Sequence, residues 1–222
     1  MLALAGLCSF VFVQSSTKSE DLPIEQTYKN FLAKFDKVEL PYSVEIKRHK
    51  TREAFYDAEN NNSADRKEGK YIGREFGDIL PEVNRGMMSR MGPDDYEAEV
   101  MLAAGKNFDA VIYSRSASFR GSKTYYVATF DKKGKMLGKM AIASQNYSSI
   151  EECKVSKDLV INVEKYKIEG MNSLEEEDTA LTYTLASSKE YVITAAGNIE
   201  STTAKNNSPE QQQAAKKDMG MR

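Results

Sequence analysis

The chain has 222 residues, of which 41% are hydrophobic and 29% charged. This length suits one domain with a buried core or two small ones, and the composition excludes a collagen, a coiled coil, a largely disordered chain and a multi-span membrane protein. Lysine and arginine total 31 against 33 aspartates and glutamates, for a net charge of -2. The two signs alternate along the sequence without a clustered basic face, so we expect no nucleic-acid partner.

Residues 2–13 form an unbroken apolar stretch near the N-terminus. Its length matches the core of a signal peptide and is too short to cross a bilayer as a helix, so we predict a signal peptide over 1–15, a polar spacer over 16–23, no membrane span, and a periplasmic or extracellular location. Cys8 raises the alternative of a lipid anchor. Leu7 precedes it where a lipobox has a small residue, so the anchor is the less favoured reading.

The first predicted elements are a helix and a strand. Apolar residues spaced by three and four indicate a short amphipathic helix over 24–35, and alternation over 42–46 indicates a strand. Residues 57–70 contain no apolar side chain larger than alanine, which predicts a solvated loop. Prolines and glycines interrupt the region 71–95, which has room for a short helix within 79–91.

Hairpins follow one another in the rest of the chain. Segments 98–103 and 108–115 flank a glycine turn, and segments 125–130 and 136–142 flank a turn in which Gly134 can take positive φ. Residues 153–155 and 159–163 form a third hairpin by pattern, across Lys157 and Asp158. We further predict that 181–185 pairs with 191–193, with a last turn at Gly197 and Asn198 before Ile199.

Successive hairpins with short links predict a mainly β fold, an antiparallel meander with a short N-terminal helix. The pattern leaves open whether the sheet is a sandwich or an open barrel. It places a single β-rich domain over 24–200. Residues 201–222 lack large apolar side chains, which predicts a disordered tail.

The span 108–201 carries a family resemblance. Its features are the strand Tyr-Tyr-Val-Ala-Thr-Phe-Asp at 125–131, the Lys-Gly-Lys turn at 133–135, the strand at 139–142, a hairpin around Val155 and a final strand at 191–197. In this layout it resembles the β-rich exported proteins and lipoproteins of unassigned function in the envelopes of Bacteroidota. The resemblance implies secretion and a mainly β fold, and it implies no catalytic residue.

Two single residues limit the possible chemistry. His49 is the only histidine, so one chain cannot build a zinc site from several histidines, and we interpret His49 as a surface residue. Removal of a signal peptide would leave Cys153 as the only thiol and no intramolecular disulfide. Its alternation with Val155 indicates a small buried side chain.

The predicted loop after Asp57 partly fits a calcium-binding template. Oxygen-bearing side chains occupy positions 1, 3, 5, 7, 9 and 12, namely Asp57, Glu59, Asn61, Ser63, Asp65 and Glu68. Position 6 is Asn62 where the template has glycine, and position 8 is Ala64 where it has an aliphatic residue. A plain hydrophilic loop is therefore the favoured reading, so we expect no cofactor, with calcium as the alternative.

Tyrosines provide the candidate binding surface. The chain has 12 of them, many in or beside the predicted strands. Large, rigid rings with a polar tip suit peptide or glycan binding, although cross-strand packing accounts for them equally well. The tyrosines selected as candidate ligand contacts are Tyr113, Tyr125, Tyr126 and Tyr183.

We expect a secreted or periplasmic binding or structural protein whose partner is an envelope protein or a glycan. Few routes to catalysis are open to a chain with one histidine and no recognisable nucleophile motif. Two alternatives remain: a carbohydrate-active hydrolase that uses carboxylates alone, and a calcium-stabilised envelope module. The sequence leaves the ligand and the oligomeric state undetermined.

Overall fold

The computed structural model describes residues 23–61, 69–85, 95–116, 123–171 and 180–202. The predicted signal peptide, most of the spacer and nearly all of the predicted tail lie outside these residues. The described helices are α1 (Ile24–Leu32), α2 (Arg52–Asn61), the 3₁₀ helix η1 (Arg74–Phe76) and α3 (Glu82–Arg85). The described strands are β1 (Asp36–Lys37), β2 (Tyr42–Val44), β3 (Asp95–Ala104), β4 (Phe108–Ser116), β5 (Lys123–Asp131), β6 (Met136–Gln145), β7 (Ser149–Val155), β8 (Val160–Glu169), β9 (Thr182–Ile193) and β10 (Ile199–Ser201).

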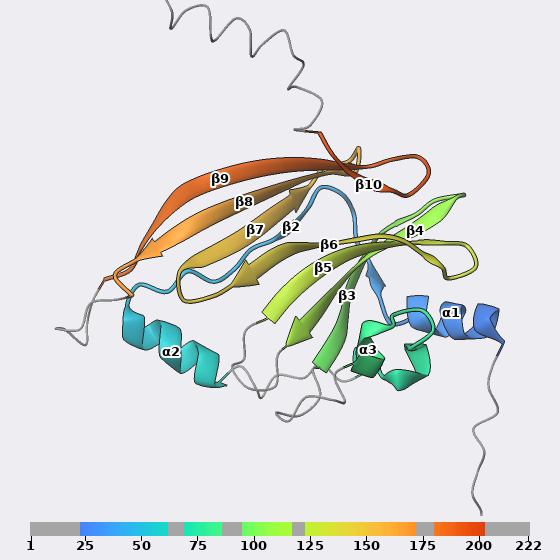
Figure 1. Ribbon diagram of the computed structural model, residues 1–222, viewed down its shortest axis with the longest axis horizontal. Helices are drawn as coiled ribbons and strands as arrows, with labels where there is room; N and C mark the ends of the chain where they lie inside the picture. Colours follow the sequence, from blue (N-terminus) through green and yellow to red (C-terminus); the bar gives the residue numbers. More distant parts are fainter. Residues whose placement is uncertain (1–22, 62–68, 86–94, 117–122, 172–179, 203–222) are drawn as a thin grey trace, which may run out of the picture.

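These strands form one open sheet of ten strands in the order β1-β3-β4-β5-β6-β7-β8-β9-β10, with β2 paired to β7 (Figure 1). The predicted mainly β, mostly antiparallel fold is confirmed, and the exception is the parallel pair β1–β3. Two turns adopt the geometry that the sequence indicated, with φ of +86° at Gly134 and +85° at Gly197. Tight hairpin turns join most neighbouring strands, which is why chain order and sheet order agree.

Strand β4 is covered on both faces. Along β4, Val111 and Tyr113 point toward α1, η1 and α3, whereas Ala110 and Ile112 point to the opposite face, and all four side chains are fully buried. Phe31 of α1 anchors the helical side, with ring centroids 5.0 to 5.6 Å from those of three other phenylalanines. This part of the sheet is therefore a central layer between two apolar cores.

The sheet divides after β6. Strands β6 and β7 pair at only two positions, Ser144 with Glu151 and Gln145 with Ile150, after which β2 occupies the β7 edge. An apolar cluster that includes Ile112, Val155 and Ile161 fills the space between the two parts. The β9–β10 turn also returns to the first part, because the Thr129 hydroxyl donates a 2.6 Å hydrogen bond to the Gly197 carbonyl.

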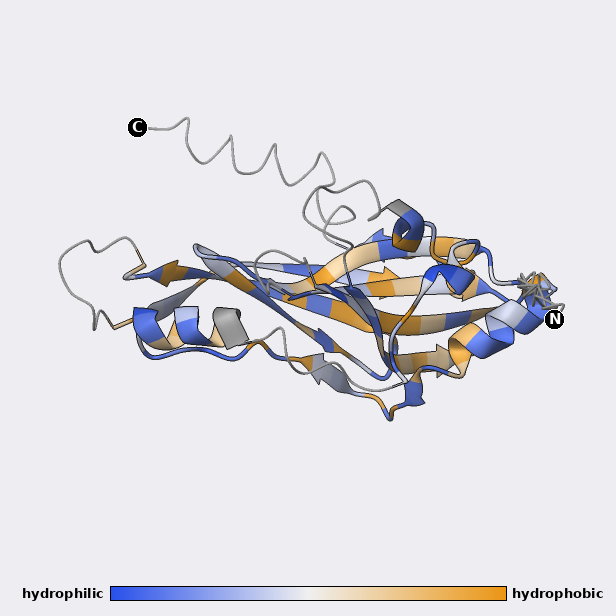
Figure 2. Cartoon of the chain, turned by 90° about the horizontal axis from the view of Figure 1, so that it is seen from below, coloured by the Kyte–Doolittle hydropathy of each residue, from blue (hydrophilic) through white to orange (hydrophobic). Residues whose placement is uncertain are grey.

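A third cluster lies at the other end of the molecule from α1 and α3 (Figure 1). There Phe55 of α2 is fully buried against a group of side chains from the β7–β9 region, namely Ile150, Ile168, Met171 and Leu181. Coloured by hydropathy, α2 is largely hydrophilic, whereas much of the chain near α1 is hydrophobic (Figure 2). Helix α2 is thus held to the sheet by a narrow apolar contact.

Three predicted elements differ from the structure. Residues 57–61 belong to α2 and are not loop. Residues 181–185 and 191–193 are predicted to pair, but 182–185 and 191–193 lie on the single long strand β9, whose neighbours are β8 and β10. The strand predicted over 42–46 ends at Val44, where the chain leaves the sheet toward α2.

Candidate functional site

A groove of about 660 Å³ lies between residues 45–48, which follow β2, and strands β7 and β8. Side chains of alternate residues on these two strands line it. By the two-residue period of a strand, they lie on the face opposite Cys153 and Ile161, which pack into the core between the two parts of the sheet. The polar residues and the aromatic ring that line the groove are Glu45, Lys47, Arg48, Glu152, Lys154, Asn162, Glu164 and Tyr166.

Two glutamates face each other across the β7–β8 ladder in this groove. Glu152 is the register partner of Glu164, and Lys154 is the partner of Asn162. Side chains directly opposite in an antiparallel pair have Cβ atoms about 4.5–5.5 Å apart, and like charges at such positions destabilise the sheet. Other groups must therefore compensate the two carboxylates.

Arg48 and Tyr166 provide this compensation. The Arg48 guanidinium donates to both oxygens of Glu152, at 2.8 Å from Nη2 and 3.4 Å from Nε, and lies 4.1 Å from the centroid of the Tyr166 ring. The Tyr166 hydroxyl donates a 2.7 Å hydrogen bond to Glu164. The bond to Glu152 raises the pKa of Arg48, and the bond to Glu164 raises that of Tyr166. The four side chains form one connected network.

The segment that carries Arg48 is fixed at its far end. The Tyr183 hydroxyl accepts from the His49 backbone N–H and donates to the His49 carbonyl, both at 3.0 Å. One residue on, the Lys50 carbonyl accepts from the Leu181 N–H at 2.9 Å. The His49 ring also meets the Phe55 ring edge-on at 5.8 Å. These contacts hold the segment against β9 and so position the guanidinium over Tyr166.

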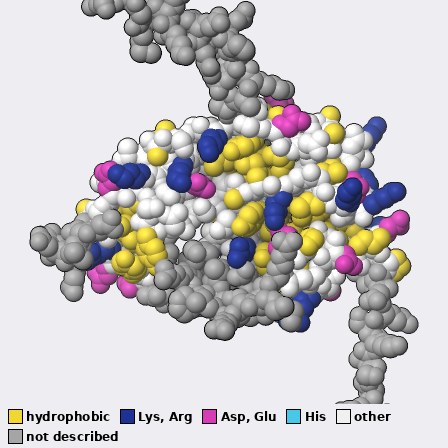
Figure 3. All heavy atoms as spheres, in the orientation of Figure 1, with side chains coloured by type: hydrophobic (Ala, Val, Ile, Leu, Met, Phe, Trp, Pro, Cys, Tyr) yellow, Lys and Arg dark blue, Asp and Glu magenta, His cyan; other side chains and the backbone are white. Residues whose placement is uncertain are grey.

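This arrangement suits a ligand rich in hydroxyl groups. Two carboxylates offer acceptors, Asn162 offers an amide and Lys154 offers a cation, in a groove that the Tyr166 ring also lines. The polar groups can form several directional hydrogen bonds with the ligand's hydroxyl groups, and an aromatic ring can contact its apolar C–H groups. Charges of both signs are also interspersed over the molecular face shown in Figure 3.

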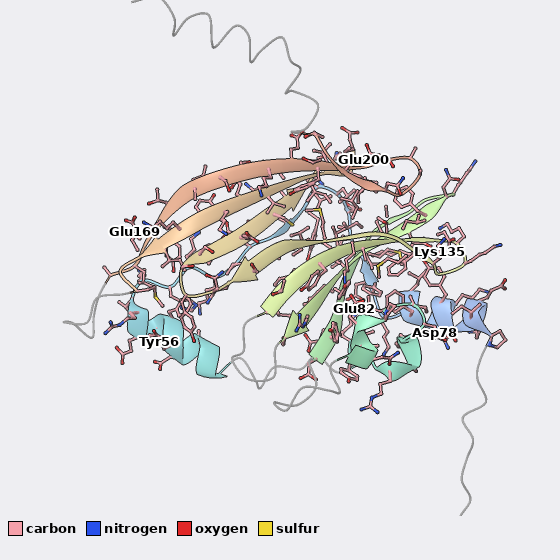
Figure 4. The ribbon with its side chains drawn as sticks, in the orientation of Figure 1. Tyr56, Asp78, Glu82, Lys135, Glu169 and Glu200 are labelled. Atoms are coloured by element: carbon pink, nitrogen blue, oxygen red, sulfur yellow. The ribbon has the colours of Figure 1, made fainter. Side chains whose placement is uncertain are left out.

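The structure separates the four tyrosines selected from the sequence. Tyr113 is fully buried, stacks on Tyr126 with 5.3 Å between ring centroids, and donates a 2.5 Å hydrogen bond to Glu82. Glu82 on α3 also pairs with Lys139, and it lies next to strands β3–β5 (Figure 4). The Tyr113 ring therefore presents no surface to a ligand.

The other tyrosines occupy different surroundings. Tyr126 is half-buried against the helical core, and Tyr125 is half-buried against the core between the two parts of the sheet. Burial raises the pKa of Tyr125 and that of Tyr183. Of the four, only Tyr183 lies beside the groove, where it holds the His49 backbone. The four tyrosines therefore do not form one binding surface.

The first half of the predicted calcium-binding loop is helical in the structure. Asp57, Glu59 and Asn61 belong to α2, in which residues two apart lie on different faces of the helix. This geometry differs from the loop that the template requires. Ser63, Asp65 and Glu68 lie outside the described residues. Among the described residues, no group of three or more His, Cys, Asp or Glu side chains could hold a metal ion.

His49, the only histidine, and Cys153 are both buried. His49 is buried, contrary to the surface position expected from its charged neighbours, because the ring packs on Phe55. Burial, and secondarily Lys47, lowers its pKa. Cys153 is buried as a free thiol, as predicted, and burial raises its pKa to about 12.

Comparison with known proteins gave no match, whether with family models, curated proteins or solved structures. Across the parts of the chain that the structure describes, no helix has the length and apolar character needed to span a membrane. The candidate site therefore rests on the geometry of the groove.

Proposed function

We propose that this protein is an exported binding protein that holds a saccharide in the groove between residues 45–48 and strands β7–β8. The observation that carries the proposal is the directly opposed pair Glu152 and Glu164, which lines a groove open to solvent. Arg48 and Tyr166 use part of the acceptor capacity of these carboxylates, and the remaining lone pairs of both can accept hydrogen bonds from a ligand. Sugar hydroxyls are such donors.

The surroundings of the pair support binding more than hydrolysis. A hydrolase that uses two carboxyl groups needs one of them to give a proton to the leaving oxygen. Here Glu152 accepts from Arg48 and Glu164 accepts from Tyr166, so both already serve as hydrogen-bond acceptors. Because the two acids do face each other, a carbohydrate-active hydrolase remains the second candidate. Release of reducing sugar from an oligosaccharide that binds would favour it.

The architecture fits this proposal. We infer a sandwich-like, half-open arrangement in which strands β3–β6 form the rigid body and strands β7–β8 present the groove on the outer side. Export follows from the apolar stretch at 2–13 and from the resemblance to envelope proteins of Bacteroidota. Fractionation of the native host with N-terminal sequencing of the mature protein tests export: a cytoplasmic protein that retains residue 1 would contradict it.

A glycan array tests the function itself. We expect the full chain to bind a subset of envelope-type oligosaccharides, and the Glu164→Gln variant to lose at least about tenfold in affinity, since one charge-assisted hydrogen bond contributes roughly 1.5–3 kcal/mol. The matched control is Glu169→Gln, which makes the same chemical change on the same strand outside this groove (Figure 4). Equal loss in both variants, or no binding by the full chain, would contradict the proposal.

A further inference from the structure

One edge of the sheet is open along most of β9. Strand β8 pairs with β9 over residues 182–192, whereas β10 pairs with it only at Tyr191, Val192 and Ile193. Among the described residues, positions 182–189 therefore have no strand on their outer side, and β9 lies at the outer margin of the sheet (Figure 1). The side chains at 184–190 are all exposed.

The sequence of this edge lacks most of the features that prevent an edge strand from pairing with a strand of another chain. Natural edge strands carry charges, prolines or bulges that prevent pairing with another chain. Residues 181–188 read Leu-Thr-Tyr-Thr-Leu-Ala-Ser-Ser, with no charge and no proline, and they are rich in residues that favour strands. The first charge is Lys189. Leu185 is 54% exposed, which makes it a large apolar side chain in the middle of the open edge.

We propose that this edge pairs antiparallel with the same edge of a second copy, with Leu185 at the two-fold axis. In this register Thr182 faces Ser188 and Tyr183 faces Ser187, while Lys189 faces Leu181. No charge then faces a like charge, and each Leu185 covers the other, so the edge is complementary to itself as a two-fold interface requires. The net charge of -2 per chain opposes association only weakly.

The bulge at Ala186 limits the length of the pairing. Lys165 pairs with Ser187 and Tyr166 with Leu185, so Ala186 is an additional residue on β9. Bulges increase the local twist of a strand. We therefore expect a short paired segment within 182–188 and a dimer that dissociates on dilution.

The test uses sedimentation of the full chain over a range of concentrations. The expected result is a monomer–dimer equilibrium that Leu185→Lys shifts by at least tenfold toward the monomer. The matched control is Ile24→Lys on α1, a side chain that is 46% exposed and lies away from the edge, and it should leave the equilibrium unchanged. A monomer at all concentrations, or a dimer that both variants weaken equally, would overturn the proposal.

A disulfide provides the second readout. In a Cys8→Ser background, Leu185→Cys should form a covalent dimer on mild oxidation, because directly opposed residues lie within the reach of a disulfide. Cys153 is buried and should not interfere. A cysteine placed at the exposed turn residue Lys133 should crosslink far more slowly, and equal rates would overturn the register.

The chain after Thr202 is the competing occupant of this edge. The Thr202 N–H donates to the Glu190 carbonyl at 3.0 Å, so Thr202 lies next to β9. If the full chain is a monomer and a variant that stops after Thr202 dimerises, the second copy is not the native occupant and the proposal is overturned. Dimerisation of both, with the same sensitivity to Leu185→Lys, supports it.

Discussion

Strands β3–β6 and strands β7–β9 belong to one sheet but differ in what covers them. On β4, all residues from Phe108 to Ser114 are buried, because helices cover one face and other strands cover the opposite face. On β9, eight of the twelve residues are exposed. Side chains available to a ligand or partner therefore gather on the second part, and the first part mainly provides stability.

The sharpest contrast is between a core phenylalanine and an exposed leucine. Phe31→Ala should lower the free energy of unfolding by roughly 3–5 kcal/mol, since it empties the centre of the helical core. Leu185→Ala should change it by less than about 0.5 kcal/mol at dilute protein concentration. Urea unfolding measures both. Similar losses of unfolding free energy in the two variants would contradict the view that the first part of the sheet provides most of the stability.

We expect the next largest loss of unfolding free energy from a substitution at a buried polar group in strands β3–β6. Asp109 is almost completely buried, accepts from the Tyr28 hydroxyl at 3.0 Å and pairs with Lys132 at 2.7 Å. Asp109→Ala should cost about 2–3 kcal/mol, since it leaves the Tyr28 hydroxyl without this partner. Tyr28→Phe removes the same bond with less disruption and should cost about 1 kcal/mol. A cost for Asp109→Ala below that of Tyr28→Phe would contradict this account.

An ion pair of the second part should matter far less for stability. The Arg48 side chain is 41% exposed in its pair with Glu152. Exposed pairs contribute about 0–1 kcal/mol, so Arg48→Met should change the unfolding free energy by at most about 1 kcal/mol while it weakens ligand binding. Thermal unfolding and a binding assay on one preparation separate these effects. A large loss of stability with unchanged binding would assign Arg48 to structure alone.

The pH dependence of stability gives a smaller effect. The pKa of His49 is lowered by burial, so on acidification the unfolded chain takes up a proton before the folded chain does. The contribution of the neutral ring is present above the ordinary histidine pKa of about 6.5 and is lost as the pH falls through the folded value. His49→Gln should flatten this part of the pH–stability curve. An unchanged slope would exclude His49 as its source.

Calcium should have the smallest effect. Because α2 continues through Asn61, the first three template positions do not form a loop. We expect the same unfolding midpoint with calcium and with a chelator. A calcium-dependent rise of several degrees that Asp57→Asn abolishes would restore the calcium-stabilised module.

The sequence predicts the strands well and the site poorly, and one turn shows why. Alternation identifies both strands of the β7–β8 hairpin, but Lys157 and Asp158 suggest a two-residue turn. The structure instead closes the turn between Ser156 and Val160, with φ of +59° at Leu159. That added residue shifts the register and places Glu152 opposite Glu164. Alternation assigns each residue to a face of its strand, but the turn decides which residues lie directly opposite each other, so sequence analysis missed the pair.

The burial of Tyr113 could not be read from the sequence for a different reason. Alternation shows that a strand has two faces, but not how many of them are covered. Both faces of β4 are covered. On one of them lie α1, which the sequence predicts, and η1 and α3, which come from the region 71–95 with irregular periodicity. Arg48 also escaped prediction, because its partners Glu152 and Tyr166 are more than a hundred residues away. Only tertiary contacts reveal a site of this kind.

Hydrogen exchange with an array-selected oligosaccharide tests the central claim most directly. The account predicts added protection at residues 45–48, 150–155 and 160–166 and none at 123–131, with the effect lost in Glu152→Gln and kept in Glu169→Gln. Protection centred on 123–131 would contradict it, because the ligand would then contact the part of the sheet that is covered on both faces.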